Sequence, residues 1–566
     1  MARTLGNELN LGRQPNGAPF GLSPDDRSRH LYVAGATRAG KSKFLENCIR
    51  QDIKQWQRHK CPVVFLDRHG SSYDDLVAWL AWNAIHLPKD LPVILFDPRE
   101  DVVLGYNVLR KRGADAGVVV DSFVQALTHV FGQLHTTATP LFAEVAGNIL
   151  WVLYELQLTL AEAIYLTDAE RKSLQAAMLA RITNSEVLRY WKSYHRLPAL
   201  KFDETIGSTV RRLRAFVLHE RFKWMFGQQQ DSLDWRLVLD QGAIVLVNLS
   251  GEAGRLTEEH ASALGSTMLH DLWLAASERG KKKDVPPAYI YLDEFQEFVS
   301  PTLAKSLAQS SGFGLHLIMS HQFPTQLKNA GPHGKAVYDE VLGNAQNKII
   351  FHMEHPEDLA LLATMLFLGV FDTNKIKLAI HSIKVLDYRE VKREQFTRGE
   401  SETEGESDQW RDATSDTTYP SGEVGTASGR DSGGGRSRSQ TKTHSVTEST
   451  VLEPVMGKEL SNVHFESLSE QLHHAMVALK DQKQREFVAK RHDLRIPMTL
   501  RTPNVSDMPC GPKRIATYVK QMRERWPFIL AVAEAQQRIE KRQQDLERRF
   551  GQIARDEAAT AKRRIR

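Results

Sequence analysis

The chain has 566 residues, of which 41% are hydrophobic and 25% are charged, and its formal net charge is +5. This length excludes a single core, because domains hold about 100–200 residues, and it predicts about three or four units. The composition is ordinary for a soluble globular protein, and the small net charge excludes any argument for nucleic-acid binding from composition alone.

Cysteine usage and the first residues of the chain indicate a reduced, intracellular protein. The three cysteines, Cys48, Cys61 and Cys510, show no paired spacing and no nearby histidine cluster that would predict zinc. Residues 1–8 lack the apolar core of a signal peptide. No stretch reaches the roughly 18 apolar residues that a spanning helix needs. We therefore expect a soluble, cytoplasmic protein without direct membrane insertion.

The first part of the chain alternates between short apolar strands and helical periods. Strands are predicted at His30–Ala34, Pro62–Asp67 and Leu91–Asp97. Apolar strands separated by helices are typical of a parallel sheet that is covered on both faces. From about Ala114 to Gln229 the strand signal disappears, and apolar residues at helical spacing, as in Leu150–Tyr154, predict a helical insertion.

The strand signal returns after this insertion. The expected strands are Ala243–Leu249, Ala288–Asp293, Leu315–Met319 and Lys348–His352. The sequence therefore predicts an α/β fold in which one sheet is interrupted by a helical domain.

The segment Gly399–Ser449 differs from the rest of the chain. Of its 51 residues, 26 are Gly, Ser or Thr, and none is Leu, Ile, Met or Phe. Such a segment cannot bury enough apolar surface to offset the entropy of ordering it, so we predict a disordered insert. Beyond it, a helix is expected around 467–480 and strands at 485–489 and 495–500.

The C-terminal end is basic, with 15 Lys and Arg against 7 Asp and Glu between Gly511 and Arg566. A charged helix is expected from about Phe528. Its sparse apolar positions predict weak docking on one face, and its arginines are available to DNA phosphates, a neighbouring subunit or a partner protein. A solvated helix without such a role is the alternative.

These changes along the chain predict seven segments. They are an N-terminal arm at 1–29, a first core part at 30–113, a helical insertion at 114–229, a second core part at 230–398, a disordered linker at 399–450, a core-completing helix and strands at 451–510, and a basic C-terminal helix at 511–566.

A phosphate-binding loop is predicted at Gly35–Ser42, which matches the pattern G-x4-G-K-[ST]. It directly follows the strand His30–Ala34 and opens a helix, so its backbone N–H groups and the helix dipole favour phosphate. Lys41 is expected to reach the β- and γ-phosphates, and Ser42 to ligate Mg²⁺. The residues predicted to hold the nucleotide are Gly35, Ala36, Thr37, Arg38, Ala39, Gly40, Lys41, Ser42 and Lys43.

An acidic pair, Asp293 and Glu294, ends the apolar strand that begins at Ala288. An aspartate at such a strand end opens beside the phosphate-binding loop and can hold Mg²⁺. Glu294 is then placed to orient and deprotonate the attacking water. An Asp-Glu pair at a strand end also serves as a helix cap, which is the alternative.

Two further polar segments follow predicted strands. Gln322 ends the strand that begins near Leu315, where its amide is placed to sense the γ-phosphate; a solvent-exposed loop glutamine is the alternative. Asp67–Gly70 follows another strand and faces the same edge of the sheet, where ligands bind in parallel sheets. A chemical role and a turn-forming role for Asp67–Gly70 are both open.

Several motifs together resemble the DNA-binding ATPase domain of type IV secretion and conjugation coupling proteins (TraG/TraD-type), within the HerA/FtsK superfamily of P-loop motors. They occur in the expected order over about residues 20–365, with weaker likeness through Pro503. The motifs are Gly21–His30 before the P-loop, Leu66–Gly70, Phe96–Pro98, Gly105–Asn107, Gly242–Ser250, Leu292–Gln296, His321–Gln322 and Gly343–Asn344.

This resemblance implies a RecA-like P-loop NTPase core with a parallel-rich central sheet, an inserted all-helical domain and a disordered insert. It also implies a hexameric ring with ATP and Mg²⁺ at subunit interfaces and DNA in a central channel. Carried over by position, Lys41 and Ser42 are the P-loop pair, Asp293 and Glu294 the metal and water residues, and Gln322 the sensor.

The sequence also departs from the family pattern. Membrane-anchored relatives carry transmembrane helices before the ATPase, whereas 34 residues precede Gly35 here. Many relatives have an Arg-Lys-x-Gly segment where this chain has Ser310–Gly314. If that arginine is the finger in relatives, the finger comes from elsewhere. Our candidates are Arg211, Arg212 and Arg214, with the solvated face of a helix as the alternative.

The leading functional hypothesis is a soluble motor that translocates DNA without sequence preference, since no base-reading motif is present. It acts either in conjugation, recruited to a secretion-channel protein, or with a partner nuclease or other effector in defence against phage DNA. The alternatives are an ATPase that energises protein-substrate secretion, and an ATP-gated scaffold that does not move DNA.

Overall fold

The structure is a computed structural model that describes residues 8–110, 115–134, 140–196, 207, 209, 219–251, 255–280, 285–299, 303–304, 307, 309–330, 333–410, 413–418, 424–429 and 432–564. The chain divides into two units. A core unit comprises Met1–Phe371 with Gln471–Arg566, and a second unit comprises Asp372–Glu470.

The core unit is built on a mixed sheet with the strand order β2-β1-β16-β15-β10-β3-β9-β8-β4-β7-β5. From β10 to β5 the neighbouring strands run parallel. These strands are β3 (Leu31–Ala34), β4 (Val63–Asp67), β5 (Val93–Phe96), β7 (Ile244–Asn248), β8 (Ala288–Leu292), β9 (Leu315–His321) and β10 (Asn347–Phe351). The predicted α/β fold class and parallel-rich sheet are confirmed.

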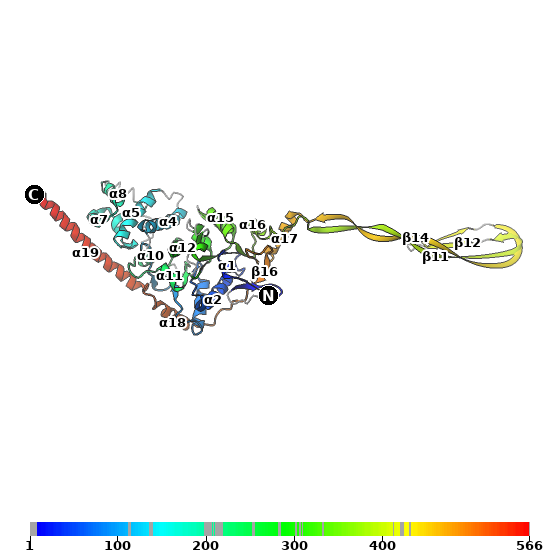
Figure 1. Cartoon of the computed structure of the whole chain (residues 1–566), viewed down its shortest axis with the longest axis horizontal. Coiled ribbons are helices and arrows are strands. Elements are labelled where there is room, and N and C mark those ends of the chain that lie inside the picture. Colours follow the sequence, from blue (N-terminus) through cyan, green and yellow to red (C-terminus); the bar gives the residue numbers. More distant parts are fainter. Residues whose placement is uncertain are drawn as a thin grey trace. The chain divides into compact units, whose positions relative to one another are not determined.

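Antiparallel strands from both ends of the chain extend this sheet beyond β10. They are β1 (Leu9–Arg13), β2 (Pro19–Leu22), β15 (Glu486–Lys490) and β16 (Met498–Arg501). Arg13 of β1 pairs with Arg501 of β16, which is labelled in Figure 1. The predicted N-terminal arm is therefore part of the sheet.

Both faces of the sheet are covered, which explains its continuous apolar strands. Val64 and Leu66 of β4 point into one hydrophobic core, and Val63 and Phe65 point into the other. On the second face lie α2 (Lys41–His59), α3 (Ser71–Asn83) and α18 (Pro512–Arg523), and on the first lies α12 (Glu258–Arg279).

Helices fill the segment between β6 (Val102–Leu104) and β7, as the periodicity predicts. They are α4 (Ala116–Leu134), α5 (Pro140–Glu155), α6 (Ala163–Thr167), α7 (Lys172–Leu179), α8 (Ser185–His195), α10 (Glu220–Phe226) and α11 (Trp235–Gln241). Among the described residues no single helix has the length and apolarity to cross a membrane, and one bent pair, Leu141–Glu155 with Leu160–Thr167, meets that test only jointly.

The remaining elements are short. The α-helices are α1 (Pro24–Arg27), α14 (Pro324–Lys328), α15 (Gly334–Asn344), α16 (Pro356–Phe367) and α17 (Leu468–Lys480), and the 3-10 helices are η1 (Leu160–Glu162), η2 (Ala169–Arg171), η4 (Phe295–Phe298) and η5 (Ser310–Phe313).

The C-terminal helix α19 (Val532–Arg564) is docked more firmly than its sparse apolar positions predict. Its approach is fixed by β17 (Ile529–Ala531), which pairs with β6. Ile539, Leu546 and Phe550 are buried. In addition, Arg542 Nη2 donates to Glu162 Oε1 at 2.8 Å, and the Glu162 side chain is fully buried. A buried carboxylate needs such a partner, so this ion pair ties α19 to the helical insertion.

The prediction of a disordered insert at 399–450 is wrong for the residues that the structure describes. β11 (Ile376–Trp410) and β14 (Ser432–Phe465) pair as one long antiparallel ribbon, with β12 (Ala413–Thr418) and β13 (Val424–Gly429) beyond it. Among the ribbon's described side chains no hydrophobic core is found, as the composition requires, but cross-strand hydrogen bonds satisfy the backbone without one. It also starts before residue 399 and ends after residue 450, so parts of both neighbouring predicted segments belong to it.

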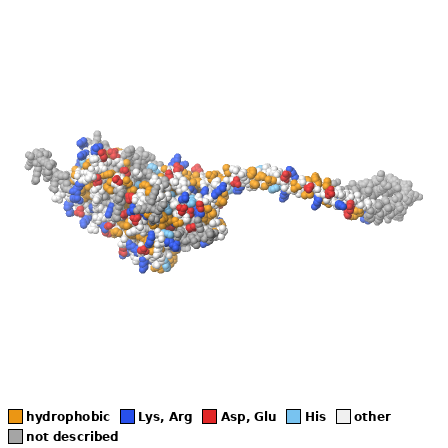
Figure 2. Space-filling view, in the orientation of Figure 1, with side chains coloured by type: hydrophobic (Ala, Val, Ile, Leu, Met, Phe, Trp, Pro, Cys, Tyr) orange, Lys and Arg blue, Asp and Glu red, His pale blue; other side chains and the backbone are white. Residues whose placement is uncertain are grey.

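Apolar side chains are exposed along the ribbon, as Figure 2 shows in orange. Examples are Ile383, Leu386, Phe396 and Met456, each more than half exposed. A two-stranded ribbon of this kind is stabilised by backbone pairing and cross-strand contacts, and an isolated one is at best marginally stable in water.

Shortening the ribbon in register should leave the core unit intact. Arg398 pairs with His444. Joining these two residues through Asn-Gly, in place of residues 399–443, therefore keeps every cross-strand pair from Ile376–Phe465 to Arg398–His444. The thermal midpoint of the core should stay within about 1 °C, because loop closure changes by only about 0.6 kcal/mol per doubling of length.

The matched control joins Arg398 to Ser445, which slips the register by one residue and turns one strand's side chains to the opposite face. The in-register variant should resist limited proteolysis at 376–398 better than the slipped one. Equal cleavage of both would contradict the ribbon and restore the disordered insert.

Candidate functional site

The predicted site residues meet at the carboxyl ends of the parallel strands. β9 lies between β3 and β8, with Ala34 paired to His321 and Leu292 paired to Met319. The P-loop after β3, the acidic pair after β8 and Gln322 after β9 therefore start from the same edge. Ligands bind at this edge in parallel sheets.

The P-loop has the backbone that a phosphate cradle requires. Gly40 has φ = 114° and lies at the N-terminus of α2, where no side chain caps the helix. A Cβ atom on Gly35 would lie 2.5 Å from Phe351 Cβ, so this position has no room for a side chain. The free N–H groups at the start of α2 point to where an anion binds.

Lys41 is folded back onto this loop. Its Nζ donates to the carbonyl oxygens of Gly35 at 2.6 Å and Ala36 at 3.2 Å. Burial lowers the pKa of Lys41, and the charges of Glu294 and Asp293 partly oppose this shift. The ammonium is thus held within the loop, where a phosphate can replace the carbonyl contacts.

Asp293 is a buried carboxylate with one unsatisfied oxygen. Its Oδ2 accepts a hydrogen bond from Ser42 Oγ at 3.4 Å, and its Oδ1 has no hydrogen-bond partner among the described residues. Burial, together with the charges of Asp67 and Glu294, raises the pKa of Asp293 to about 7. A divalent cation would relieve this crowding of negative charge, and a hydroxyl with a carboxylate suits Mg²⁺, so these residues fit the metal.

Glu294 is held in a left-handed backbone conformation with φ = 50°. Its carboxylate accepts hydrogen bonds from Gln296 Nε2 at 2.8 Å and from Gln322 Nε2 at 3.2 Å. Burial alone would raise its pKa, but the contact with His69, these two bonds and the charge of Lys41 lower the pKa to about 2. Glu294 is therefore ionised at neutral pH.

Gln322 links the P-loop to this carboxylate. Its Oε1 accepts a hydrogen bond from Thr37 Oγ1 at 3.2 Å, while its Nε2 donates to Glu294. The Gln322 amide therefore lies between two predicted site residues. This position favours the sensor interpretation over a solvent-exposed loop glutamine. Sequence reasoning assigned no role to Gln296, although this residue ends the motif Leu292–Gln296.

The structure gives Asp67 and His69 different roles. Asp67 accepts the backbone N–H groups of His69 at 2.9 Å and Tyr73 at 2.7 Å, which caps the turn into α3. His69 Nε2 lies 3.8 Å from Glu294 Oε1, and this contact raises the pKa of His69. The turn-forming interpretation holds for Asp67, and His69 is a neighbour of the site.

The side chain of Lys43 is engaged in ion pairs. Its ammonium pairs with Glu46, Asp75 and Asp507 at 3.1, 2.7 and 2.8 Å, so the predicted contact of Lys43 with the nucleotide would use its backbone N–H. The signal was available, since a lysine one turn before a glutamate on a helix commonly forms such a pair. The candidate fingers Arg211, Arg212 and Arg214 lie outside the described residues.

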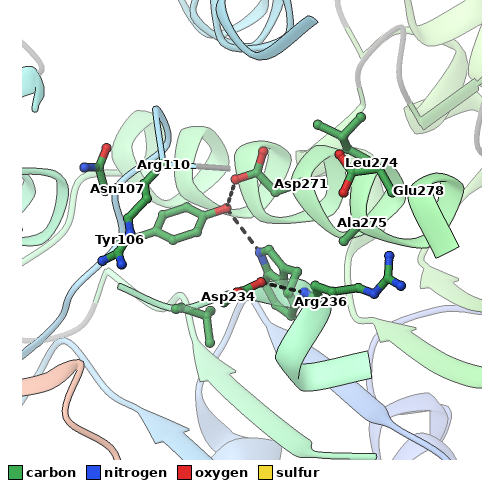
Figure 3. A pocket seen from close by; sticks show the side chains of 11 residues that line it. Tyr106, Asn107, Arg110, Asp234, Arg236, Asp271, Leu274, Ala275 and Glu278 are labelled. Carbon is green, nitrogen blue, oxygen red and sulfur yellow. Dashed lines mark hydrogen bonds between the residues drawn. The ribbon is translucent and has the colours of Figure 1, made fainter. Parts of the chain in front are cut away.

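A polar cavity between the loop after β6, α11 and α12 is a separate feature (Figure 3). Tyr106 Oη donates to Asp271 Oδ2 at 2.5 Å and accepts from Trp235 Nε1 at 3.2 Å. The cavity holds about 40 Å³, which is room for a water molecule and not for a nucleotide. Its side chains bond to one another, as expected for structural packing.

A known protein family matches the part of the chain that holds the predicted site residues after β8 and β9. Residues 287–405 match the family model described as the TraM recognition site of TraD and TraG. This range contains β8, Asp293, Glu294 and Gln322, so the predicted resemblance to TraG/TraD-type proteins is confirmed there. The search of curated proteins found no match.

Solved structures of conjugation proteins are also similar. The bacterial conjugative coupling protein TrwBdeltaN70, in an unbound form, has 13% identity and a TM-score of 0.48, covering 89% of this chain and 90% of that one. The plasmid coupling protein TrwB in complex with ADP and Mg²⁺ has 12% identity and a TM-score of 0.48, covering 89% and 91%. VirB4 of Thermoanaerobacter pseudethanolicus has 16% identity and a TM-score of 0.40, covering 64% and 88%. TM-scores below 0.5 establish neither the fold nor the ligands of this chain.

Proposed function

We propose that this chain, which resembles TraG/TraD-type coupling proteins over residues 287–405, is an ATPase that drives DNA through a ring of identical subunits. One observation carries the proposal. The P-loop, Asp293, Glu294 and Gln322 converge at the carboxyl edge of a parallel sheet. Thr37 and Ser42 of the P-loop donate hydrogen bonds to Gln322 and Asp293, and Gln322 donates one to Glu294.

The proposed binding step uses the P-loop and the first turn of α2. The backbone N–H groups of Gly35–Lys43 surround the phosphates of ATP, and Lys41 exchanges its bonds to the Gly35 and Ala36 carbonyls for bonds to phosphate oxygens. Ser42 and Asp293 would hold Mg²⁺, which supplies charge neutralisation of the phosphates when bound.

The proposed hydrolytic step uses Glu294. Phosphoryl transfer passes through a loose transition state, so orienting the water matters more than removing its proton early. A carboxylate with a pKa of about 2 is a weak base but a firm hydrogen-bond acceptor, which suits orientation. Gln296, Gln322 and His69 hold it in place.

Gln322 is the proposed link between nucleotide state and movement. Its side-chain amide is hydrogen-bonded to Thr37 of the P-loop and to Glu294 at the same time. A γ-phosphate that binds the Gln322 amide would have to replace one of these two hydrogen bonds. Because Gln322 directly follows β9, a change at its amide is passed to the segment that leads into α14.

DNA as the substrate rests on the family resemblance and on the basic C-terminal end of the chain. On the face that Figure 2 shows, the basic and acidic side chains of the described residues are interspersed, so no large basic surface marks a DNA-binding site there. A hexamer, a cytoplasmic location and a secretion-channel protein as partner belong to this proposal. The match to a recognition site of TraD and TraG favours conjugation over a nuclease or effector in defence.

The test compares ATP turnover with and without single-stranded and double-stranded DNA. Turnover should rise several-fold with DNA, and DNA affinity should fall steeply with salt, losing about 10³–10⁵ between 50 and 200 mM if six to ten phosphates are contacted. Two DNA duplexes of different sequence should bind equally. If DNA neither binds at about 50–100 mM salt nor changes turnover, an ATPase for protein secretion or a scaffold replaces the DNA motor.

A further inference from the structure

Left-handed backbone conformations occur at and beside the proposed nucleotide site. In the described part of the chain, six residues other than glycine have a positive φ: His30, Arg38, Lys60, Gln157, Glu294 and Arg485. Arg38 belongs to the P-loop, and Glu294 is the proposed water-orienting residue. Strained residues cluster at functional sites, so Arg485, with φ = 71°, is a candidate for a role at the nucleotide site.

Arg485 is fixed to the P-loop through its backbone. It lies in the loop between α17 and β15, and its N–H donates to the carbonyl oxygen of Ala39 at 3.1 Å. Its own carbonyl accepts the N–H of Thr502 at 3.0 Å. A Cβ built on Gly40 would lie 3.5 Å from Arg485 N and 3.6 Å from its Cα. An extended arginine side chain is longer than this separation, so Arg485 is long enough to span from its backbone to the cradle.

The carboxylates at the site, together with a bound polyphosphate, would be stabilised by a cation in addition to Lys41. Lys41 faces the carboxylates of Asp293 and Glu294, the charge of Asp67 also acts on Asp293, and a bound polyphosphate would add more negative charge. The Arg485 side chain is half-buried, and among the described residues no hydrogen bond or ion pair to its guanidinium is found. A guanidinium that is fixed at its backbone, unpaired and next to a phosphate cradle suits phosphate binding.

We propose that Arg485 binds the phosphate chain of the nucleotide in the P-loop, so that the antiparallel strands β15 and β16 complete the site from the C-terminal part of the chain. The inference rests on the proposed nucleotide binding and deepens it. The strain at Arg485 is then the cost of keeping an arginine, and not a glycine, at this position.

The decisive variant is Arg485→Gly, because it removes the guanidinium and relieves the strain together. The thermal midpoint without nucleotide should stay constant or rise by about 1–2 °C. The Kd for ATP and for inorganic tripolyphosphate should each rise about tenfold or more, as expected for loss of a charge-assisted bond. Arg485→Lys should keep part of this affinity.

The matched control is Gln157→Gly, which relieves the same kind of strain at an exposed residue outside the site (φ = 55°). It should leave both Kd values unchanged. Unchanged Kd values in Arg485→Gly would overturn the proposal. A loss for ATP without a loss for tripolyphosphate would place Arg485 at the base or ribose and overturn the phosphate assignment. A lower midpoint would make Arg485 a structural residue. Wild-type protein that binds neither ligand would overturn the proposed function itself.

Discussion

Glu294→Gln should bind ATP with near wild-type affinity and lose ATP turnover by about 10²–10⁴-fold. The amide keeps the shape of the side chain and one acceptor oxygen, but it replaces the ionised carboxylate that three neighbours hold in position. Loss of the charge should also release His69, whose pKa is raised mainly by its bond to Glu294 and should fall toward its ordinary value.

Steady-state phosphate release and binding of a fluorescent ATP analogue are the two measurements. Glu297→Gln is the matched control, since it makes the same chemical change three residues away, where the carboxylate lies 3.9 Å from Arg68. The control should keep turnover within a few-fold. Turnover in Glu294→Gln equal to that of wild type would remove Glu294 from the mechanism.

The sequence predicted the centre of the site because its signals are local. The P-loop pattern lies between a strand and a helix, and Asp293, Glu294 and Gln322 directly follow apolar strands. Parallel strands bring such ends to one edge, so convergence follows from the fold class without knowledge of the strand order. This is why the predicted residues meet, with Thr37 and Ser42 in contact with Gln322 and Asp293.

What the sequence did not predict depends on contacts between distant residues. Arg485 meets Ala39 across more than four hundred residues, and the pairing of β1 with β16 joins the two ends of the chain. The ribbon was missed for another reason. Amino-acid composition indicates whether a segment can form a hydrophobic core. It does not indicate whether two strands pair through their backbones, as β11 and β14 do.

Lys41→Ala should weaken ATP binding by at least about 100-fold, which corresponds to the loss of one or two bonds to charged phosphates. The variant also removes the bonds from Lys41 Nζ to the Gly35 and Ala36 carbonyls, so the empty loop loses part of its support. Turnover should be undetectable at ATP concentrations that saturate the wild type. Titration of a fluorescent ATP analogue measures the effect, and Lys54→Ala is the control, because Lys54 is an exposed lysine on the same helix. The control should bind as the wild type does. An affinity within threefold of wild type in Lys41→Ala, with the fold intact by circular dichroism, would show that phosphate is not bound in this loop, and both the nucleotide site and the assignment of Arg485 would fall with it.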